Sequence, residues 1–492
     1  MVAGNHNHPP RGTGRIYEKM AMYFSRHLYY NGQACFLSFT QGGASPSIRL
    51  RRGFRDAAFV LWTTRIQVRY SILFCVRSVV MIKDRLTLSN AEKVLLASLM
   101  AFPIVDYVFR HVIGFGGGLW DKGVILLLFI LALLRKFETE RPETGLKTPI
   151  TVFVLFGLLM VFFRMPTFGI GFEGFRADYQ FMIALFIGYY VFAHSGQWMF
   201  AIRVLMGTAV LVGFYGLLQP FLGVQMPAGW VDSGEAVSFR AFSIVQSPNI
   251  LGSYMALMIP AGIGLFFAER EKRWKIIWGL VVLVLLATLL ATLSRGAWMA
   301  FAAAIVFLAV LIDRRVLIAV IISGVLVLLF VPQVTDRVTY VFSDTYIERS
   351  SEDGRIARWG GALDQVRSEP FFGNGIGHHG GAVAQRNLGV TYVDNYYAKQ
   401  MAETGLVGLS LFVWVMGAIV YAGFTRTRAM ADMQKRWLMR GILTGLVAVM
   451  LHNGVENIFE SPFMTVYFWF MAGALLALPL LPDKEEVTQH EG

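Results

Sequence analysis

Charged residues are scarce in this 492-residue chain: they fill 15% of its positions, whereas soluble domains average about 25%. Cysteine is scarcer still, and Cys35 and Cys75 alone exclude a disulfide framework. No group of His, Asp and Glu shows metal-ligand spacing, so we expect no metal and no cofactor. The N-terminus also lacks the apolar core and cleavage site of a signal peptide.

Long apolar runs dominate the chain instead, and 55% of its residues are hydrophobic. A bilayer core about 30 Å thick takes roughly 20 apolar residues per helix, and a helix satisfies its own backbone groups there. None of the runs alternates with period two, as the strands of a membrane barrel would. We therefore predict an all-α polytopic membrane protein with about twelve transmembrane helices. The predicted spans are 91–112, 119–134, 149–163, 178–194, 198–219, 248–268, 274–292, 297–312, 316–332, 403–424, 437–453 and 463–481.

Basic residues gather in the loops on one side of this predicted bundle. With twelve spans, these loops all fall on the side of the N-terminus, which the positive-inside rule makes cytoplasmic. The residues are Arg135, Lys136, Arg141, Lys147, Arg270, Lys272, Arg273, Lys275, Arg314, Arg315, Arg426, Arg428, Lys435 and Arg436. The opposite, external side then holds the turn at 293–296, the long segment 333–402 and the turn at 452–462.

The predicted organisation has five parts. They are a basic cytoplasmic or interfacial extension (1–90), transmembrane helices 1–9 (91–332), an external catalytic loop (333–402), helices 10–12 (403–482) and a cytoplasmic tail (483–492). The first 93 residues carry fourteen Lys and Arg against four acidic residues, most of the net charge of +12. We interpret this charge as attraction to anionic lipid headgroups, not as nucleic-acid binding. Met81 as the natural start remains an open alternative.

Polar groups near membrane depth are candidates for function. Arg240 precedes Ser247-Pro248-Asn249, which opens the next span, and Arg295 lies in the short turn Leu293-Ser294-Arg295-Gly296. A guanidinium presents a planar fork of donors that fits phosphate oxygens. For an isolated arginine, reaching to the interface is the simpler reading.

Several external segments resemble the O-antigen ligase and polysaccharide polymerase superfamily of bacterial membrane proteins. The resemblance covers roughly residues 90–480. The matching features are Arg240 followed by Ser-Pro-Asn, Ser294-Arg295-Gly296, Arg358-Trp359 ahead of Pro370-Phe371-Phe372-Gly373-Asn374-Gly375-Ile376-Gly377, and Asp394-Asn395-Tyr396-Tyr397 followed by Ala402-Glu403-Thr404-Gly405.

The resemblance implies a bundle similar to type C glycosyltransferases, acting on the outer face of the bacterial cytoplasmic (inner) membrane. The implied reaction is inverting and metal-independent, and it polymerises oligosaccharide repeats carried on undecaprenyl diphosphate. The partners would be that donor, a glycan acceptor and the lipid bilayer, with no nucleic acid. Arg240 and Arg295 would hold the diphosphate.

Asp394 stands where ligases of this family usually have a histidine, which would activate the acceptor hydroxyl. A carboxylate can do this work if its pKa suits the operating pH. The alternative is that Asp394 caps the helix that leads to Glu403. Family members with Asp at this position resemble polymerases, so Asp394 favours a polymerase over a ligase. His378 and His379 are rival bases or exposed loop residues.

Five further residues are candidates for substrate binding beside His378: Arg355, Arg358, Glu403, Tyr396 and His452. The two arginines sit on a predicted helix around 356–366 that Pro370 ends. Glu403 would either position Arg295 or Arg240 by an ion pair or face water at the helix end. Tyr396 would either stack on a sugar ring or anchor the chain at the membrane interface.

Three other functions stay open. A ligase would move the finished glycan to lipid A core or to protein. A flippase or transporter of lipid-linked sugars would show inverted repeats with broken helices, and we find no convincing repeat. A scaffold for cell-wall assembly would have no activity of its own. The sugar, its linkage and the oligomeric state do not follow from the sequence.

Overall fold

The computed structural model describes residues 85–138, 141–163, 167–192, 198–227, 239–312, 314–340, 343–352 and 354–481. Almost all of the predicted extension 1–90, both cysteines, Met81 and the tail 483–492 lie outside these residues. The described residues form helices and loops, and no strand occurs among them. The all-α prediction is therefore confirmed for the described part of the chain.

The first helices are α3 (Arg85–Met100), α4 (Phe102–Tyr107), η1 (Val108–Ile113), α5 (Trp120–Glu138), α6 (Lys147–Phe163), α7 (Phe168–Tyr179), η3 (Gln180–Met182), α8 (Ile183–Tyr190), α9 (Trp198–Leu218) and η4 (Ser243–Val245). Then follow α10 (Pro248–Ala268), α11 (Lys272–Ala291), α12 (Arg295–Ile312), α13 (Arg314–Phe330), α14 (Pro332–Thr339), α15 (Asp344–Glu352), α16 (Arg355–Ser368) and α17 (Ala382–Leu388). The chain ends with α18 (Tyr396–Ala429), α19 (Met433–His452), η6 (Ile458–Glu460), α20 (Pro462–Ala477) and η7 (Leu478–Leu480).

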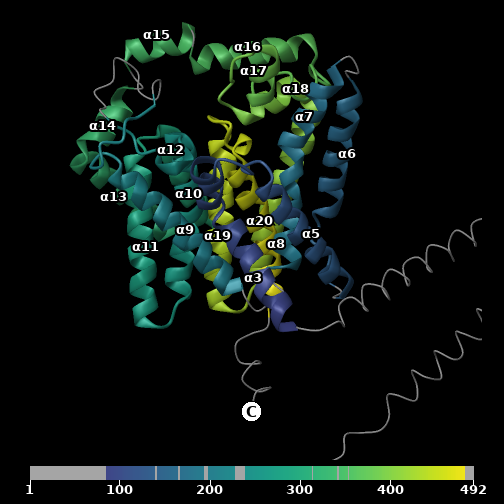
Figure 1. Cartoon of the computed structure of the whole chain (residues 1–492). Helices are drawn as coiled ribbons and strands as arrows, with labels where there is room; N and C mark the ends of the chain where they lie inside the picture. The colour runs from purple at the N-terminus through teal and green to yellow at the C-terminus, as the bar shows by residue number, and fades with distance from the viewer. Residues whose placement is uncertain are drawn as a thin grey trace, which may run out of the picture. The chain divides into compact units, whose positions relative to one another are not determined.

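The centre of the bundle is built from α10, α19 and α20, which are buried along most of their length (Figure 1). Small residues let these helices approach closely. A Cβ on Gly441 or Gly445 of α19 would clash with backbone oxygens of α10, and one on Gly473 of α20 would clash with α8. Such close packing of small residues is how helices associate in lipid, where burial of apolar surface gives little driving force.

Within the described part of the chain, five helices are long and apolar enough to cross a membrane: α9, α10, α11, α18 and α20 extended by η7. A sixth span results if α3 and the stretch from α4 to η1, bent by 79° at their junction, count as one. The chain is thus a multi-pass membrane protein, but twelve spans are not confirmed. Each predicted span contains helix, yet α6 and α13 are short, α5 carries charges near both ends, and 178–194 is broken by η3.

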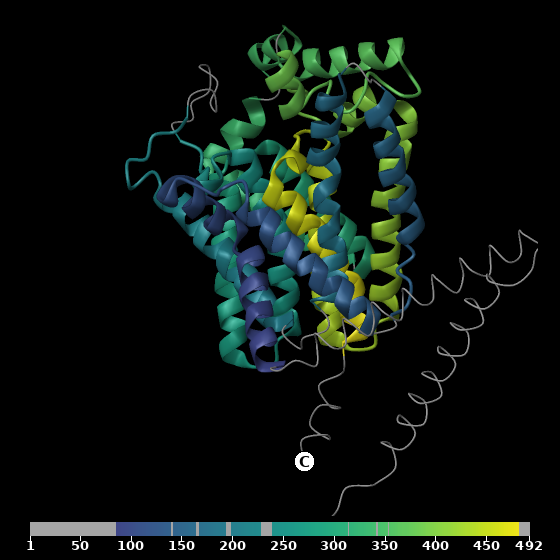
Figure 2. The same cartoon turned by 45° about the vertical axis from the view of Figure 1, so that its right-hand side comes forward.

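The 333–402 segment is folded, as predicted, into α14, α15, α16 and α17, and α15 and α16 lie across one end of the bundle (Figure 1). The helix predicted around 356–366 is confirmed as α16, which stops before Pro370. The turn after Pro370 packs against α18 at its kink, where Gly405 has a φ of +66° and lies against Phe371. A side chain on Gly405 would be strained and would clash, so this contact requires glycine. Beyond the kink, α6 packs along α18 (Figure 2).

Candidate functional site

A cavity of about 840 Å³ lies where α14, α15 and α16 meet the adjoining ends of α10, α12 and α19. Six of the nine predicted site residues line it: Arg240, Arg295, Arg355, Arg358, Asp394 and His452. The remaining lining includes Asn249, Ser294, Gly296, Arg337, Tyr340, Tyr346, Glu352, Tyr392, Glu456 and Glu460. These residues lie far apart in the sequence, and the fold brings them to one site.

Arg240 is positioned by the chain on both sides of it. Gln219, at the end of α9, accepts hydrogen bonds from the backbone N–H groups of Phe242 and Ser243 at 3.2 and 2.8 Å. The Arg240 side chain, only 5% exposed, donates from Nε to the Thr292 carbonyl at 3.0 Å. One terminal nitrogen donates to Asn249 Oδ1 at 2.9 Å. Arg240 is thus aimed at the start of α10.

The Ser-Pro-Asn sequence has a structural explanation. Ser247 is the N-cap of α10 and accepts from the Ile250 N–H, and Pro248 takes the first helical position, where its missing N–H costs nothing. Asn249 follows with its side chain in the cavity. Its Oδ1 also accepts from Ser294 Oγ at 3.0 Å. A single amide therefore joins the Arg240 segment to the turn that carries Arg295.

Arg295 opens α12, directly after that turn. Its guanidinium lies over the ring of Tyr346 at 4.8 Å and over that of Tyr340 at 5.8 Å, both within cation–π range. Gly296 packs against His452: a Cβ there would lie 2.9 Å from the ring nitrogen Nε2. The Ser-Arg-Gly sequence thus supplies a hydrogen bond to Asn249, a cation and a close contact with α19.

Arg337 is a cavity residue that sequence reasoning missed. It is buried in α14, its Nε donates to the Leu293 carbonyl at 3.1 Å, and its own carbonyl lies 3.5 Å from a terminal nitrogen of Arg295. Nothing in the local sequence distinguishes it from an ordinary charge after a span. Its contacts place it beside Arg295.

Asp394 also lines the cavity. Arg358 donates to its Oδ2 at 2.6 Å, and Arg355 Nε lies 4.0 Å from the same oxygen. The alternative in which Asp394 caps α18 is wrong, because Asn395 is the N-cap and accepts from the Ala398 N–H at 3.0 Å. Asp394 itself has a left-handed backbone with a φ of +51°.

Backbone strain gathers around this cavity. Among the described residues, the non-glycine positions with positive φ are Ser243, Gln246, Leu293 and Asp394. Two follow Arg240 in the chain, one precedes Ser294, and the fourth lines the cavity. Such conformations cost about 1–3 kcal/mol each and are typical of functional sites, where the surrounding structure holds them.

Glu456 connects Asn249 with Arg355. It follows α19, its side chain is 15% exposed, and it accepts a hydrogen bond from Asn249 Nδ2. Arg355 lies 3.5 Å from its Oε2. Burial is the main cause that raises the pKa of Glu456, and Asp394 adds to it while Arg355 and the Asn249 hydrogen bond act in the opposite direction. A continuous polar chain therefore runs from Arg240 through Asn249, Glu456 and Arg355 to Asp394.

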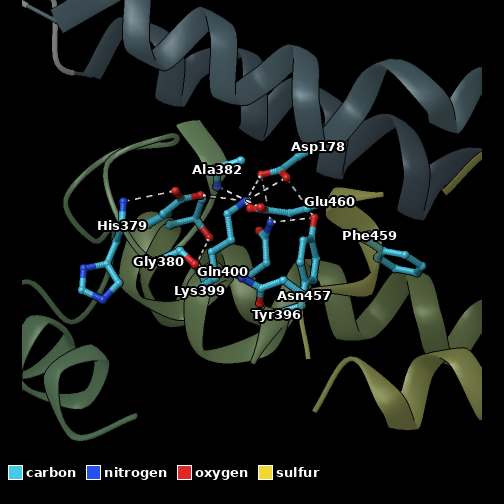
Figure 3. A network of polar contacts seen from close by, with 12 residues as sticks. Asp178, His379, Gly380, Ala382, Tyr396, Lys399, Gln400, Asn457, Phe459 and Glu460 are labelled. Atoms are coloured by element: carbon cyan, nitrogen blue, oxygen red, sulfur yellow. Dashed lines mark hydrogen bonds and ion pairs between the residues drawn. The ribbon is translucent and has the colours of Figure 1, made fainter. Parts of the chain in front are cut away.

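Tyr396 and Glu403 belong to a different, buried network around Lys399, whose polar contacts Figure 3 draws. At its centre Lys399, 4% exposed, lies 2.9 Å from Asp178 and 3.5 Å from Glu403. Glu460 approaches the same ammonium group to 3.4 Å and also lines the cavity. Glu403 contacts Lys399 and accepts a hydrogen bond from the His379 N–H, so its partners differ from the arginines that we expected it to position.

Packing explains why the three remaining predicted site residues do not line the cavity. The Tyr396 hydroxyl donates to Asp178 at 3.2 Å, and its ring is 2% exposed, so no sugar can stack on it. His378 lies beside Thr167, with 2.8 Å between its Nε2 and the hydroxyl oxygen. Burial lowers the pKa of His379. The structure does not bring these residues to the cavity.

Positive charge in the cavity comes from five arginines, against the four carboxylates of Glu352, Asp394, Glu456 and Glu460. Within the described ranges, no group of three or more His, Cys, Asp or Glu is arranged to hold a metal ion. A site of this composition suits a ligand with two or more negative charges and several hydroxyl groups.

Comparison with known families bears on this site. The protein-family model described as O-antigen ligase matches residues 280–413, which run from the second half of α11 to the first half of α18. The match contains Arg295, Arg337 and Asp394, while Arg240 and Glu456 lie outside it. No curated protein matches the sequence.

The match confirms the predicted resemblance to the O-antigen ligase superfamily. It supports a role in membrane glycan ligation or polymerisation, with a lipid-linked glycan as substrate.

Proposed function

We propose that this chain is an inverting glycosyltransferase that polymerises oligosaccharide repeats carried on undecaprenyl diphosphate. The observation that carries the proposal is the joining of Arg240 and Arg295 at one cavity through Asn249 and Ser294. The two residues lie far apart in the sequence, yet both line one cavity, and Arg295 lies within the residues that match the O-antigen ligase family model.

The chemistry follows from these charges. An acceptor hydroxyl attacks the anomeric carbon of the donor sugar as the bond from that carbon to the diphosphate oxygen breaks. The electron pair leaves with undecaprenyl diphosphate, and Arg240 and Arg295 stabilise the charge that develops there. A carboxylate takes the proton of the attacking hydroxyl; Asp394 and Glu456 are the candidates that line the cavity near the bridging Arg355.

Our proposal places this cavity on the outer face of the cytoplasmic membrane, with residues 333–402 as a cover over it. The distribution of basic residues among the loops supports this orientation, because with twelve spans these loops all fall on one side of the membrane. Under the same proposal, the basic residues 1–90 and the tail 483–492 lie on the cytoplasmic side.

Replacement of Arg240 or Arg295 by Ala tests the proposal. Removing one preorganised donor to a developing charge typically costs about 100- to 1,000-fold in kcat. The assay is extension of a lipid-linked oligosaccharide by the purified protein. Arg367→Ala is the matched control, because this arginine lies on α16 with 78% of its side chain exposed and pairs only at the surface with Asp364. Wild-type rates in both site variants would refute the proposal.

A ligase remains the second candidate, because the matching family model carries that description. The two reactions share the donor and differ in the acceptor. Supplying the protein with lipid-linked repeats alone, or with lipid A core as well, separates them. Products longer than one repeat without lipid A core indicate a polymerase.

A further inference from the structure

Two carboxylates compete for the role of general base in the proposed transfer, and this inference rests on that reaction. Sequence reasoning named Asp394 as the base, with His378 and His379 as rivals, and did not consider Glu456 for this role. In the structure, Arg355 lies between Asp394 and Glu456, 4.0 Å from an oxygen of the first and 3.5 Å from an oxygen of the second. The partners of each carboxylate distinguish their roles.

The contacts of Asp394 connect two helices. One oxygen accepts from Arg358 at 2.6 Å and faces Arg355 as well, and both arginines belong to α16. Asn395, the next residue, caps α18. Asp394 thus ties α16 to the start of α18 and sets the position of two guanidinium groups. These contacts assign it a positioning role.

Glu456 is held differently, by an amide that is itself fixed. Asn249 Oδ1 accepts from both Arg240 and Ser294, so its Nδ2 must be the group that faces Glu456. This arrangement leaves no ambiguity in the orientation of the amide. Only this amide separates the carboxylate from Arg240, so Glu456 is next to the predicted diphosphate site. In an inverting displacement the acceptor attacks the anomeric carbon on the face opposite the diphosphate oxygen, so the base has to lie close to the diphosphate site but across the sugar from it.

The surroundings of Glu456 favour proton uptake by its carboxylate. Burial raises its pKa, and the negative charge of Asp394 acts in the same direction. Arg355 from α16 and the hydrogen bond from Asn249 of α10 oppose this, and His452 is the neighbouring titratable residue of the cavity on α19. A buried carboxyl group with a raised pKa is the usual form of a catalytic carboxylate.

We propose that Glu456 is the general base and that Asp394 positions Arg355 and Arg358. As the acceptor oxygen bonds to the anomeric carbon, its proton moves to a carboxylate oxygen of Glu456. The electron pair of the broken bond leaves with undecaprenyl diphosphate. Neutral Glu456 then returns its proton to water before the next transfer, so the residue starts each cycle as a carboxylate.

The test compares Glu456→Gln, Glu456→Asp and Asp394→Asn in the full-length protein, using extension of an undecaprenyl-diphosphate-linked oligosaccharide. Protonated Glu456 cannot accept a proton, so kcat of the wild type falls as pH is lowered through the pKa of this residue. Glu456→Gln should lower kcat by about 100- to 10,000-fold, with little change in donor KM, and its residual activity should lack this acidic limb. Glu456→Asp should restore part of kcat and keep the limb.

Asp394→Asn should retain the acidic limb, since the base is intact, and should act mainly on KM. An acidic limb that persists in Glu456→Gln, or that disappears in Asp394→Asn, would overturn the assignment. If Glu456→Gln does not fold, the profile of Asp394→Asn decides alone. Failure of the proposed function looks different: the wild type itself would not extend the lipid-linked oligosaccharide.

Discussion

Asn249 offers the sharpest single perturbation, because one amide holds three groups of the site. Its Oδ1 accepts from Arg240 at 2.9 Å and from Ser294 at 3.0 Å, and its Nδ2 donates to Glu456. Asn249→Ala removes all three contacts, two of which involve charged partners. A hydrogen bond to a charged group contributes about 1.5–3 kcal/mol.

Loss of even one such bond in the transition state corresponds to roughly 10- to 160-fold in rate, since 1.36 kcal/mol is a factor of ten. We therefore expect kcat/KM for extension of the lipid-linked oligosaccharide to fall at least about tenfold in Asn249→Ala. The control is Asn387→Ala, whose exposed amide also donates to a carboxylate, that of Glu173 at 2.9 Å, but far from the cavity lining. Full activity of Asn249→Ala would refute the view that this amide organises the site.

Two further predictions concern the supports of the site. Lys399→Met leaves three carboxylates in a buried cluster, so we expect a loss of about 3–5 kcal/mol in stability, seen as a lower Tm in detergent, whereas exposed Lys272→Met should not lower it. An equal Tm in both variants would contradict this account. Tyr346→Ala removes the ring 4.8 Å from Arg295, a contact of about 0.5–2 kcal/mol, so kcat/KM should fall about 2- to 30-fold, and Tyr346→Phe, which keeps the ring, should lose much less. Equal losses in the two Tyr346 variants would show that the hydroxyl, not the ring, matters.

The membrane character and the helical 333–402 segment could be predicted from the sequence because apolar runs and helix periodicity are local signals. The number of spans could not be confirmed in this way. The segment 178–194 reads as one apolar run, yet the chain breaks at η3, and α3 bends by 79° from α4. Such breaks depend on packing against neighbouring helices, which a hydropathy pattern does not contain.

The cavity arginines illustrate the same limit. Arg240 and Arg295 were found because each stands beside a short motif that the fold explains, Ser-Pro-Asn and Ser-Arg-Gly. Arg337 has no such motif, and only the fold of α14 brings it beside Arg295. Glu403 was expected beside the arginines, but Lys399, one helical turn earlier, is its partner. An ion pair between residues four apart on one helix could have been predicted for Glu403 before a contact with distant arginines.

Binding of undecaprenyl diphosphate to the purified protein tests the central claim most directly, with undecaprenyl phosphate as the comparison ligand. Two converging guanidinium groups should favour the ligand with the additional phosphate. The account predicts tighter binding of the diphosphate by the wild type, and loss of this preference in both Arg240→Ala and Arg295→Ala. A preference that survives in both variants would contradict the claim that these arginines form the diphosphate site.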